Sequence, residues 1–357
     1  MNATILRLPD LSDADAAAWR SFQASDPALA SPYFSLDYLG VLETVYPGIR
    51  VLKLGPADAP AGFLPYRSDM LGTARPADGF LGDLHGVIAM PGTRLDMTSA
   101  LKAAGIGGYA FSALPYQQVR HGFRGSNGDG NQVVDLSQGY EAYLQERYNY
   151  NSSFRRTHRK VLAFLDNPAL SVEHDTFDVK AFRRLIELKQ QGYGRAGHFD
   201  IFQLGWPEHL LHQLAQNDCG EVKGVLSVMR LEGELVAACF CMRSASVLHY
   251  WFPGYEDRFA DQKPGHAMLF SLLDWAGAQG IKEVHLGLGN VQYKRQMASF
   301  AAPVRQGTLA IALPQKALAG FHAWSARWEA EGRGAGAFSA RVARKIERVA
   351  MSGKLSA

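Results

Sequence analysis

The sequence predicts an α/β (α+β) protein made of two units and a C-terminal basic helix. Its 357 residues exceed the usual size of one domain. Hydrophobic residues make up 47% of the chain, which is enough for two sizeable cores. In the second half, segments with helical and strand periodicity follow one another as two helices, three strands, a helix and a strand.

The first predicted unit spans residues 1–135. Apolar periodicity and turn residues divide it into short elements. Helices are expected over 13–22, 34–45 and 98–104, and strands over 49–54, 61–66 and 109–114. The segment FRGSNGDGN, 123–131, has the composition of a flexible loop.

A mainly helical connector is predicted over 136–165. Its stretch RYNYNSSFRRTHRK, 147–160, holds five lysines and arginines and no acid. A helix face that is merely solvated has this composition. The alternative is a binding wall for a phosphorylated substrate, because guanidinium groups match phosphate oxygens and a tyrosine can stack on a sugar or a base. The residues of this candidate substrate site are Tyr148, Arg155, Arg156 and Arg159.

The second predicted unit spans 166–315. Its first helix, 179–192, places Lys189 in register with the apolar residues Phe182, Leu185 and Ile186. Glu232-Gly233 is a turn that joins two strands into a hairpin. The strands are expected over 170–174, 222–231, 234–242, 247–252, 283–287 and 304–313, and a second helix over 206–217.

A hexapeptide, Gln262-Lys263-Pro264-Gly265-His266-Ala267, stands between the 247–252 strand and a third helix, which ends at Gly280. A helix N-terminus offers backbone N–H groups and a positive dipole end, so it binds phosphate. Gly265 lets an anion approach the backbone, and Pro264 lacks only an N–H that would have no partner inside the helix. Lys263 adds a positive charge.

This Q-x-x-G-x-A pattern, between a strand and a helix, resembles the pyrophosphate loop Q/R-x-x-G-x-G/A of the GNAT acyltransferases. The wider stretch resembles the branch with the Fem-like aminoacyl transferases and the acetyltransferase-like proteins of cellulose and exopolysaccharide synthesis. Pro264-Gly265 at the helix start and Tyr293-Lys294 after the next strand match features of that branch. The resemblance is strongest over about 165–313.

The resemblance implies two GNAT-like units in tandem, with mixed, mostly antiparallel sheets flanked by helices. Residues 1–135 would be a degenerate GNAT-like domain, and 166–315 the domain that binds the co-substrate, acetyl-CoA or another acyl-CoA. The expected cofactor-binding residues are Gln262, Lys263, Gly265, His266 and Ala267.

The candidate catalytic residues follow from the needs of acyl transfer. The leaving thiolate needs a proton, which Tyr293 is placed to give, and the oxyanion or an acceptor phosphate needs a cation, for which Lys294 is the candidate. A packed aromatic and a surface lysine are the alternatives. His249 and His285 are candidate bases because histidine titrates near neutrality, although a strand histidine is more often structural.

The chain departs from the branch at three positions. His285 and Asn290 stand where acidic residues are expected, and Met297 replaces an expected aromatic residue. The general base is therefore left open, and proton loss through water to solvent is an alternative to a dedicated base.

Composition excludes several other classes. The net charge of +3 is too small to indicate nucleic-acid binding. The three cysteines, Cys219, Cys239 and Cys241, lack zinc spacing and are expected to be buried free thiols, which fits a reducing compartment. No metal site is predicted. With no signal peptide or long apolar run, we expect a cytoplasmic protein.

The predicted tail, 316–357, is basic. Over 321–357 it holds seven lysines and arginines against three glutamates. An amphipathic helix is predicted there, with an apolar stripe of Phe338, Val342, Ile346 and Val349. It would dock on its own domain or contact an anionic membrane surface, a partner or a nucleotide.

These observations predict an acyl-CoA-dependent N-acyltransferase. The resemblance implies that its acceptor is an amino sugar, free or linked to a nucleotide or lipid, in exopolysaccharide or envelope polysaccharide synthesis. Three alternatives stay open: a Fem-like transferase that uses aminoacyl-tRNA on a cell-wall precursor, an O-acyltransferase, and a non-catalytic GNAT-like protein whose basic tail senses an anionic nucleotide.

Overall fold

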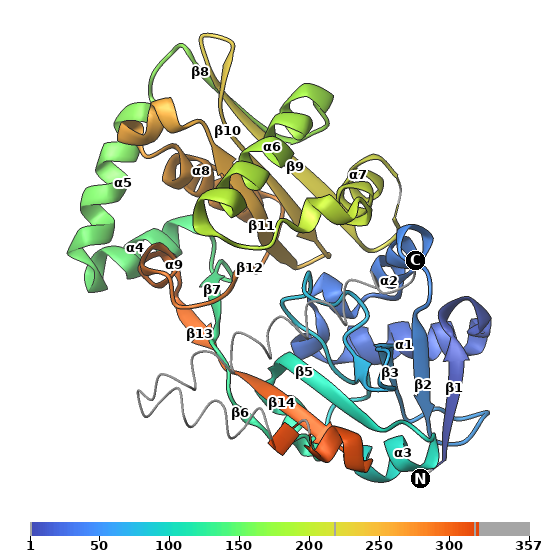
Figure 1. Cartoon of the computed structure of the whole chain (residues 1–357). Coiled ribbons are helices and arrows are strands. Elements are labelled where there is room, and N and C mark those ends of the chain that lie inside the picture. Colours follow the sequence, from blue (N-terminus) through green and yellow to red (C-terminus); the bar gives the residue numbers. More distant parts are fainter. Residues whose placement is uncertain (1, 218, 318, 321–357) are drawn as a thin grey trace. The chain divides into compact units, whose positions relative to one another are not determined.

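The computed structural model describes residues 2–217, 219–317, 319 and 320, so the predicted basic helix within 321–357 lies outside the described residues. The chain forms two compact units. Unit 1 comprises 2–29, 47–128 and the described residues from 303 onward, and unit 2 comprises 30–46 and 129–302. Figure 1 shows their elements.

This division differs from the boundaries predicted from the sequence. The predicted last strand of the second domain is β14 (Val304–Ala310), which pairs with β5 (Gly108–Pro115) in the sheet of unit 1. Conversely, β7 (Asn131–Asp135) falls within the first domain predicted from the sequence, 1–135. In the structure it pairs with β12 (Glu283–Leu288) in unit 2. The predicted connector 136–165 is not separate, because its helices contribute buried residues to the core of unit 2.

Unit 1 contains a mixed sheet in the order β1-β2-β3-β4-β5-β14-β6, in which only β4 and β5 pair in parallel. Helices α1 and α3 belong to the same unit. The remaining bounds are β1 (Ala3–Arg7), β2 (Arg50–Leu54), β3 (Gly62–Ser68), β4 (Ala74–Arg75), β6 (Ser126–Asn127), α1 (Asp13–Ser25) and α3 (Met97–Ala103).

A segment of unit 1 fills the place between β3 and β5, beyond the short β4. Ile88 exchanges two backbone hydrogen bonds with Phe63 of β3, both 2.8 Å long. On the other side, His85 Nε2 accepts the N–H groups of Ser112 and Ala113 of β5, at 3.2 and 3.3 Å. The segment 85–88 therefore occupies the gap in this sheet as an extra piece of extended chain.

Unit 2 contains a mixed sheet in the order β13-β7-β12-β11-β10-β9-β8, in which only β11 and β12 pair in parallel. The predicted hairpin is confirmed, because β9 and β10 flank Glu232-Gly233, both of which have positive φ. The remaining strands are β8 (Leu170–Thr176), β9 (Lys223–Leu231), β10 (Glu234–Arg243), β11 (Val247–Tyr255) and β13 (Phe300–Ala302).

Helices cover both faces of this sheet, with α6 and α8 on opposite sides (Figure 1). Helices α4 and α5 pack with α8, whereas α7 packs with α2 on the side of α6. Their bounds are α2 (Leu36–Val45), α4 (Tyr140–Tyr150), α5 (Ser152–Leu165), α6 (Val179–Ala196), α7 (Trp206–Gln216) and α8 (Pro264–Ala278).

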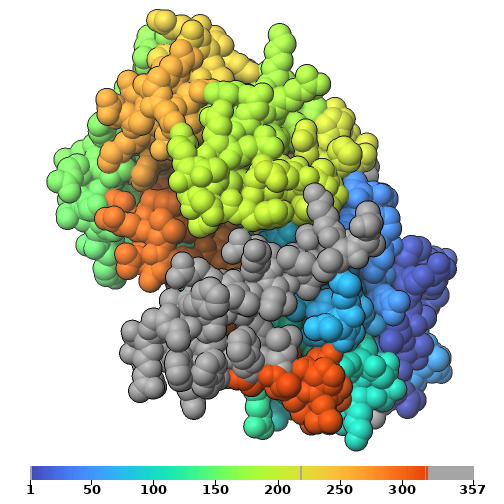
Figure 2. All heavy atoms as spheres, viewed as in Figure 1, coloured from blue at the N-terminus to red at the C-terminus, as the bar shows by residue number. Residues whose placement is uncertain are grey.

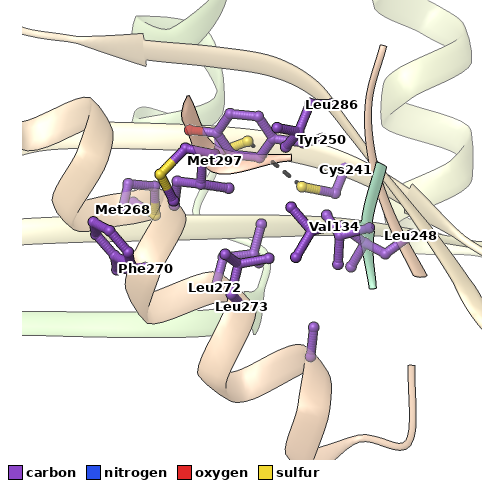
Figure 3. Packing of buried hydrophobic residues seen from close by; sticks show 14 of the residues in the cluster. Val134, Cys241, Leu248, Tyr250, Met268, Phe270, Leu272, Leu273, Leu286 and Met297 are labelled. Carbon is purple, nitrogen blue, oxygen red and sulfur yellow. Dashed lines mark hydrogen bonds between the residues drawn. The ribbon is translucent and has the colours of Figure 1, made fainter. Parts of the chain in front are cut away.

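The main core of unit 2 lies between the sheet and α8. Side chains from successive turns of α8 meet Cys241, Leu248 and Tyr250 of the strands (Figure 3). Burying an aliphatic or aromatic side chain of this size contributes about 1.5–3 kcal/mol. The three cysteines are free and buried, as their spacing predicts. None of the described helices combines the length and the apolar character needed to cross a membrane.

Candidate active site

The hexapeptide forms a sharp entry into α8. Residues Asp257–Gln262 make a 3-10 turn, η6, and Lys263 then adopts a left-handed conformation with φ 55° and ψ 52°. Pro264 is the first residue of α8, as expected of a proline at a helix start. The Lys263 carbonyl accepts the N–H groups of His266 and Ala267, at 3.0 and 3.1 Å.

Gly265 leaves the backbone uncovered at this point. A Cβ on Gly265 would meet only the ring of Tyr255, at 3.5 and 3.7 Å, which is ordinary van der Waals contact. Packing therefore does not require a glycine here. A physical reason for glycine at position 265 is that it lets a ligand reach the backbone at the start of α8.

A cavity of about 400 Å³ lies beside this helix start. It is bounded by the outer half of β11, by the junction of η6 and α8, and by Tyr293. Its lining residues are Tyr250, Pro253, Tyr255, Ala260, Lys263, Pro264, Gly265, His266, Leu269 and Tyr293.

The cavity lies along a stretch of β11 that has lost its neighbour in the sheet. β11 and β12 pair at only three positions, the last being His249 with His285. Just after His285, the ladder between β12 and β7 shifts register, and Gly287 and Gly289 take positive φ values of 82° and 101°. The part of β11 that follows His249 is then outside the β11–β12 ladder, and it lies beside the cavity.

Tyr293 and Lys294 lie on the short helix α9 (Gln292–Met297). The Tyr293 ring lies 6.3 Å from that of His266, centroid to centroid, and burial, with a smaller effect of Cys239, raises the pKa of Tyr293 to about 12. The phenol therefore keeps its proton near neutral pH. Lys294 Nζ donates to the carbonyl oxygen of Leu288, at 2.7 Å.

Helix α4 holds α9 in place. The Tyr143 hydroxyl donates to the Met297 carbonyl at 2.7 Å, and Arg147 Nη2 donates to the Gln296 carbonyl at 2.9 Å. Met297 itself is fully buried in the core of unit 2. Its apolar packing explains why this chain does without the aromatic residue expected there.

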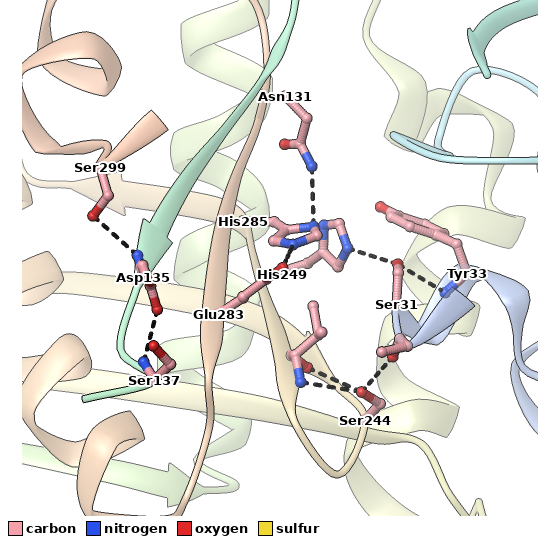
Figure 4. Close-up of polar contacts among 12 residues, drawn as sticks. Ser31, Tyr33, Asn131, Asp135, Ser137, Ser244, His249, Glu283, His285 and Ser299 are labelled. Carbon is pink, nitrogen blue, oxygen red and sulfur yellow. Dashed lines mark hydrogen bonds and ion pairs between the residues drawn. The ribbon is translucent and has the colours of Figure 1, made fainter. Parts of the chain in front are cut away.

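The two candidate histidines face each other where β11 and β12 part (Figure 4). Their ring centroids lie 4.7 Å apart, with the ring planes at 76°. Both nitrogens of His285 have partners, Glu283 Oε2 at 2.9 Å and Asn131 Nδ2 at 3.0 Å. Because the Asn131 amide donates to Nδ1, the proton of neutral His285 lies on Nε2 and points to Glu283.

His249 is buried, and only one of its two ring nitrogens has a hydrogen-bond partner among the described residues. Its Nε2 pairs with the Ser31 hydroxyl at 2.9 Å, and Tyr33 packs edge-on against its ring. Its Nδ1 has no protein partner among the described residues. Burial, and then the neighbouring His285, hold the pKa of His249 well below its usual range, so the ring is neutral near pH 7. Of the two predicted bases, only His249 has a ring nitrogen without a hydrogen-bond partner among the described residues.

The predicted substrate residues lie on α4 and α5. Arg155, Arg156 and Arg159 are all exposed. The Arg155 guanidinium donates to the Tyr148 carbonyl and lies 5.7 Å above the Tyr148 ring. The Tyr148 hydroxyl is paired with His158 Nδ1. Tyr148 is thus engaged in local packing, which leaves less of its ring for the stacking role expected from the sequence.

Sequence reasoning did not assign a role to Lys189, on α6. Its ammonium lies 5.5 Å from the centroid of the Tyr193 ring, and none of the described carboxylates forms an ion pair with it. Burial lowers the pKa of Lys189, and the charge of Lys294 adds to this effect. The available signal was a lysine in register with an apolar helix stripe.

Comparison with known proteins agrees with this geometry. Residues 151–295 match the family described as the acetyltransferase (GNAT) domain. The crystal structure of FemX superposes with a TM-score of 0.59 at 11% identity, covering 89% of this chain and 98% of that one. No curated protein matches the sequence.

Two further solved structures share the fold. One is the C-terminal domain of a protein from Agrobacterium fabrum described as a lysylphosphatidylglycerol synthetase (TM-score 0.51, 11% identity, covering 79% of this chain and 90% of that one). The other is a tandem GNAT protein from the clavulanic acid biosynthesis pathway (TM-score 0.50, 11% identity, covering 87% and 98%). Unit 2 therefore carries a GNAT acyltransferase domain, and the whole chain has a tandem GNAT fold. The chain thus contains a domain similar to the GNAT acetyltransferases, and FemX is among the solved structures that share its fold.

Proposed function

We propose that the protein is an acyl-CoA-dependent N-acyltransferase whose donor binds in unit 2. The observation that carries the proposal is the convergence of three features on one cavity: the uncovered start of α8, the open edge of β11, and the protonated phenol of Tyr293. The Q-x-x-G-x-A residues 262–267 would hold the pyrophosphate of the donor.

The open edge of β11 suits the amide-containing arm of an acyl-CoA. Such an arm can add to a sheet edge as an extra strand, through backbone hydrogen bonds. The apolar side chains that line the cavity would keep water away from the thioester.

The transfer then proceeds by attack of the acceptor amine on the thioester carbonyl. A C–N bond forms and the C–S bond breaks. Tyr293 gives its proton to the leaving thiolate and regains one from solvent, while the proton of the amine leaves through His249 or water. Lys294 stabilises the oxyanion or holds a phosphate of the acceptor.

For the acceptor, we propose an amino sugar, free or carried on a nucleotide or lipid, in exopolysaccharide or envelope polysaccharide synthesis. This choice rests on the likeness of the 261–297 stretch to that branch of the superfamily. A hydroxyl acceptor would fit the same geometry. We further propose cytoplasmic action, which the three buried free cysteines support.

Calorimetry with acetyl-CoA and longer acyl-CoAs, followed by thiol-release assays with amino sugars, tests this function. We expect micromolar binding of at least one acyl-CoA and acceptor-dependent release of CoA. Failure of the protein to bind any CoA ester would overturn the donor assignment. Binding without turnover on any amine or hydroxyl acceptor would favour a non-catalytic role.

A further inference from the structure

Helix α5 has a fixed orientation in unit 2. Gln296 Nε2 of α9 donates to the Ser153 hydroxyl at 2.8 Å. The rings of Phe154 and His158 pack on Phe270 of α8, with centroids 5.4 and 4.5 Å away. One flank of α5 therefore faces α9, and the helix covers the same side of the sheet as α8.

The basic residues of α5 divide between its two flanks. At about 100° per residue, Arg156 and Lys160 fall on the flank of Ser153, toward α9. Arg155 falls on the other flank, where its guanidinium contacts Tyr148. Arg156 and Lys160 are exposed, and within the described residues no carboxylate pairs with either.

Helix α5 adjoins two of the elements that line the donor cavity. Helix α5 contacts both η6 and α9, and each of these contributes a wall of the cavity, through Ala260 and Tyr293. Figure 2 shows α5, in green, on the surface of unit 2. Arg156 and Lys160, which have no ion-pair partner within the described part of the chain, thus lie on a helix that adjoins two walls of the cavity.

We propose that Arg156 and Lys160 bind the ribose 3′-phosphate of the CoA donor, an inference that rests on the proposed function. The cavity and the start of α8 account for the acyl arm and the pyrophosphate, so the nucleotide end lies outside, where its phosphate monoester needs cations. Guanidinium and ammonium groups are the side chains that bind such a dianion. Arg156 therefore serves the donor, in place of the acceptor role expected from the sequence, and Lys160 serves it as well.

The test compares CoA with 3′-dephospho-CoA, which lacks only this phosphate. Calorimetry is run on wild type, on the double variant R156A/K160A, and on R155A as a matched control from the opposite flank. We expect wild type to prefer CoA by roughly fivefold to thirtyfold, a preference that weakens with added salt. The double variant should lose that preference and bind dephospho-CoA as wild type does, whereas R155A should keep the wild-type ratio.

The other outcomes overturn the inference in distinguishable ways. Equal affinity of wild type for both nucleotides, or loss of the preference in R155A alone, contradicts the phosphate site and leaves the proposed function intact. If neither nucleotide binds, the proposed function falls. If, in addition, R156A/K160A binds an aminoacyl-tRNA more weakly than wild type in a gel-shift assay, this flank binds phosphates of tRNA. The CoA assignment is then wrong.

Discussion

Among single residues, Tyr293 and His249 divide the proton transfers that we propose. Burial raises the pKa of Tyr293 to about 12, which keeps the phenol as a proton donor, and it lowers that of His249, which keeps the imidazole as an acceptor. Burial thus leaves each group in the protonation state that its proposed role requires.

Replacing Tyr293 with Phe removes the proposed acid without changing the shape of the ring. We expect turnover to fall by roughly 10²- to 10⁴-fold, because one general-acid step is lost, with donor affinity nearly unchanged. Steady-state kinetics and calorimetry measure the two effects. Tyr150→Phe, at a tyrosine that is 82% exposed, is the control. Wild-type turnover in Tyr293→Phe would remove Tyr293 from the mechanism.

The interaction of Lys189 with Lys294 gives a second prediction about single residues. The charge of Lys294 contributes to the lowered pKa of Lys189, so Lys294→Met should raise the pKa of Lys189. NMR titration of ¹³C-dimethylated lysines measures it. Lys263→Met removes a cavity lysine that does not contribute to this shift, and should leave the Lys189 titration unchanged. An unaltered Lys189 titration in Lys294→Met would mean that the two charges are not neighbours in solution.

Among the elements, the start of α8 differs from the rest of that helix. Gly265 and Gly277 both have room for a Cβ, with the nearest atoms at 3.5 Å and 3.6 Å. Only Gly265 lines the cavity. The two glycines therefore separate an effect on the ligand from an effect on the helix.

Gly265→Ala should fold normally and bind acyl-CoA more weakly, by about tenfold, because the methyl group covers the backbone that the pyrophosphate approaches. Gly277→Ala should keep donor affinity and raise stability by about 0.5–1 kcal/mol, the usual gain of alanine over glycine inside a helix. Thermal unfolding and calorimetry test both. Unchanged donor affinity in Gly265→Ala would place the pyrophosphate elsewhere.

At the scale of the whole molecule, the sheets of the two units differ at the place where two neighbouring strands part. In unit 2 a cavity adjoins the part of β11 that lies beyond the ladder with β12, whereas in unit 1 residues 85–88 fill the gap between β3 and β5. The amide of Gln118 also exchanges two hydrogen bonds, each 2.9 Å long, with the Val87 backbone. In the described part of unit 1, this segment therefore occupies the place that corresponds to the proposed donor cavity of unit 2.

Calorimetric titration of the intact chain with acyl-CoA should consequently give a stoichiometry of about one. The Gly265→Asp variant, which places a carboxylate at the pyrophosphate position in unit 2, should abolish all donor binding. A stoichiometry near two, or residual binding in that variant, would show that the segment 85–88 leaves unit 1 accessible.

Buried histidines predict acid lability of the fold. Burial lowers the pKa of His85 to about 3 and that of His174 to about 4, from an ordinary value of 6.5. Because the unfolded chain binds these protons first, stability is fully present above pH 6.5 and is lost as the pH falls toward 4. Between the folded and unfolded pKa values of His85, the free energy of unfolding falls by up to about 1.4 kcal/mol for each pH unit of acidification. Urea unfolding at pH 8, 6 and 5 measures this loss; a constant free energy of unfolding would contradict it.

The local features of this protein were predictable from the order of its residues. The loop 262–267, the helix after it, the hairpin at Glu232-Gly233 and the Tyr293-Lys294 pair all lie within short windows, where glycine, proline and apolar periodicity act directly on the backbone. The GNAT-like order of elements followed from these windows, and the match over 151–295 agrees with it.

Contacts between distant residues could not be read in the same way. Ser31 meets His249 across 218 positions, and Asn131 meets His285 across 154. β14 pairs with β5 of unit 1, although it follows the strands of unit 2 in sequence. Only the folded chain decided which histidine has an unpartnered ring nitrogen among the described residues, that Lys189 is near Lys294, and that α5 packs on the same side of the sheet as α8. Strand pairing and buried polar contacts depend on which surfaces of distant segments are buried against each other. Local residue patterns do not determine this.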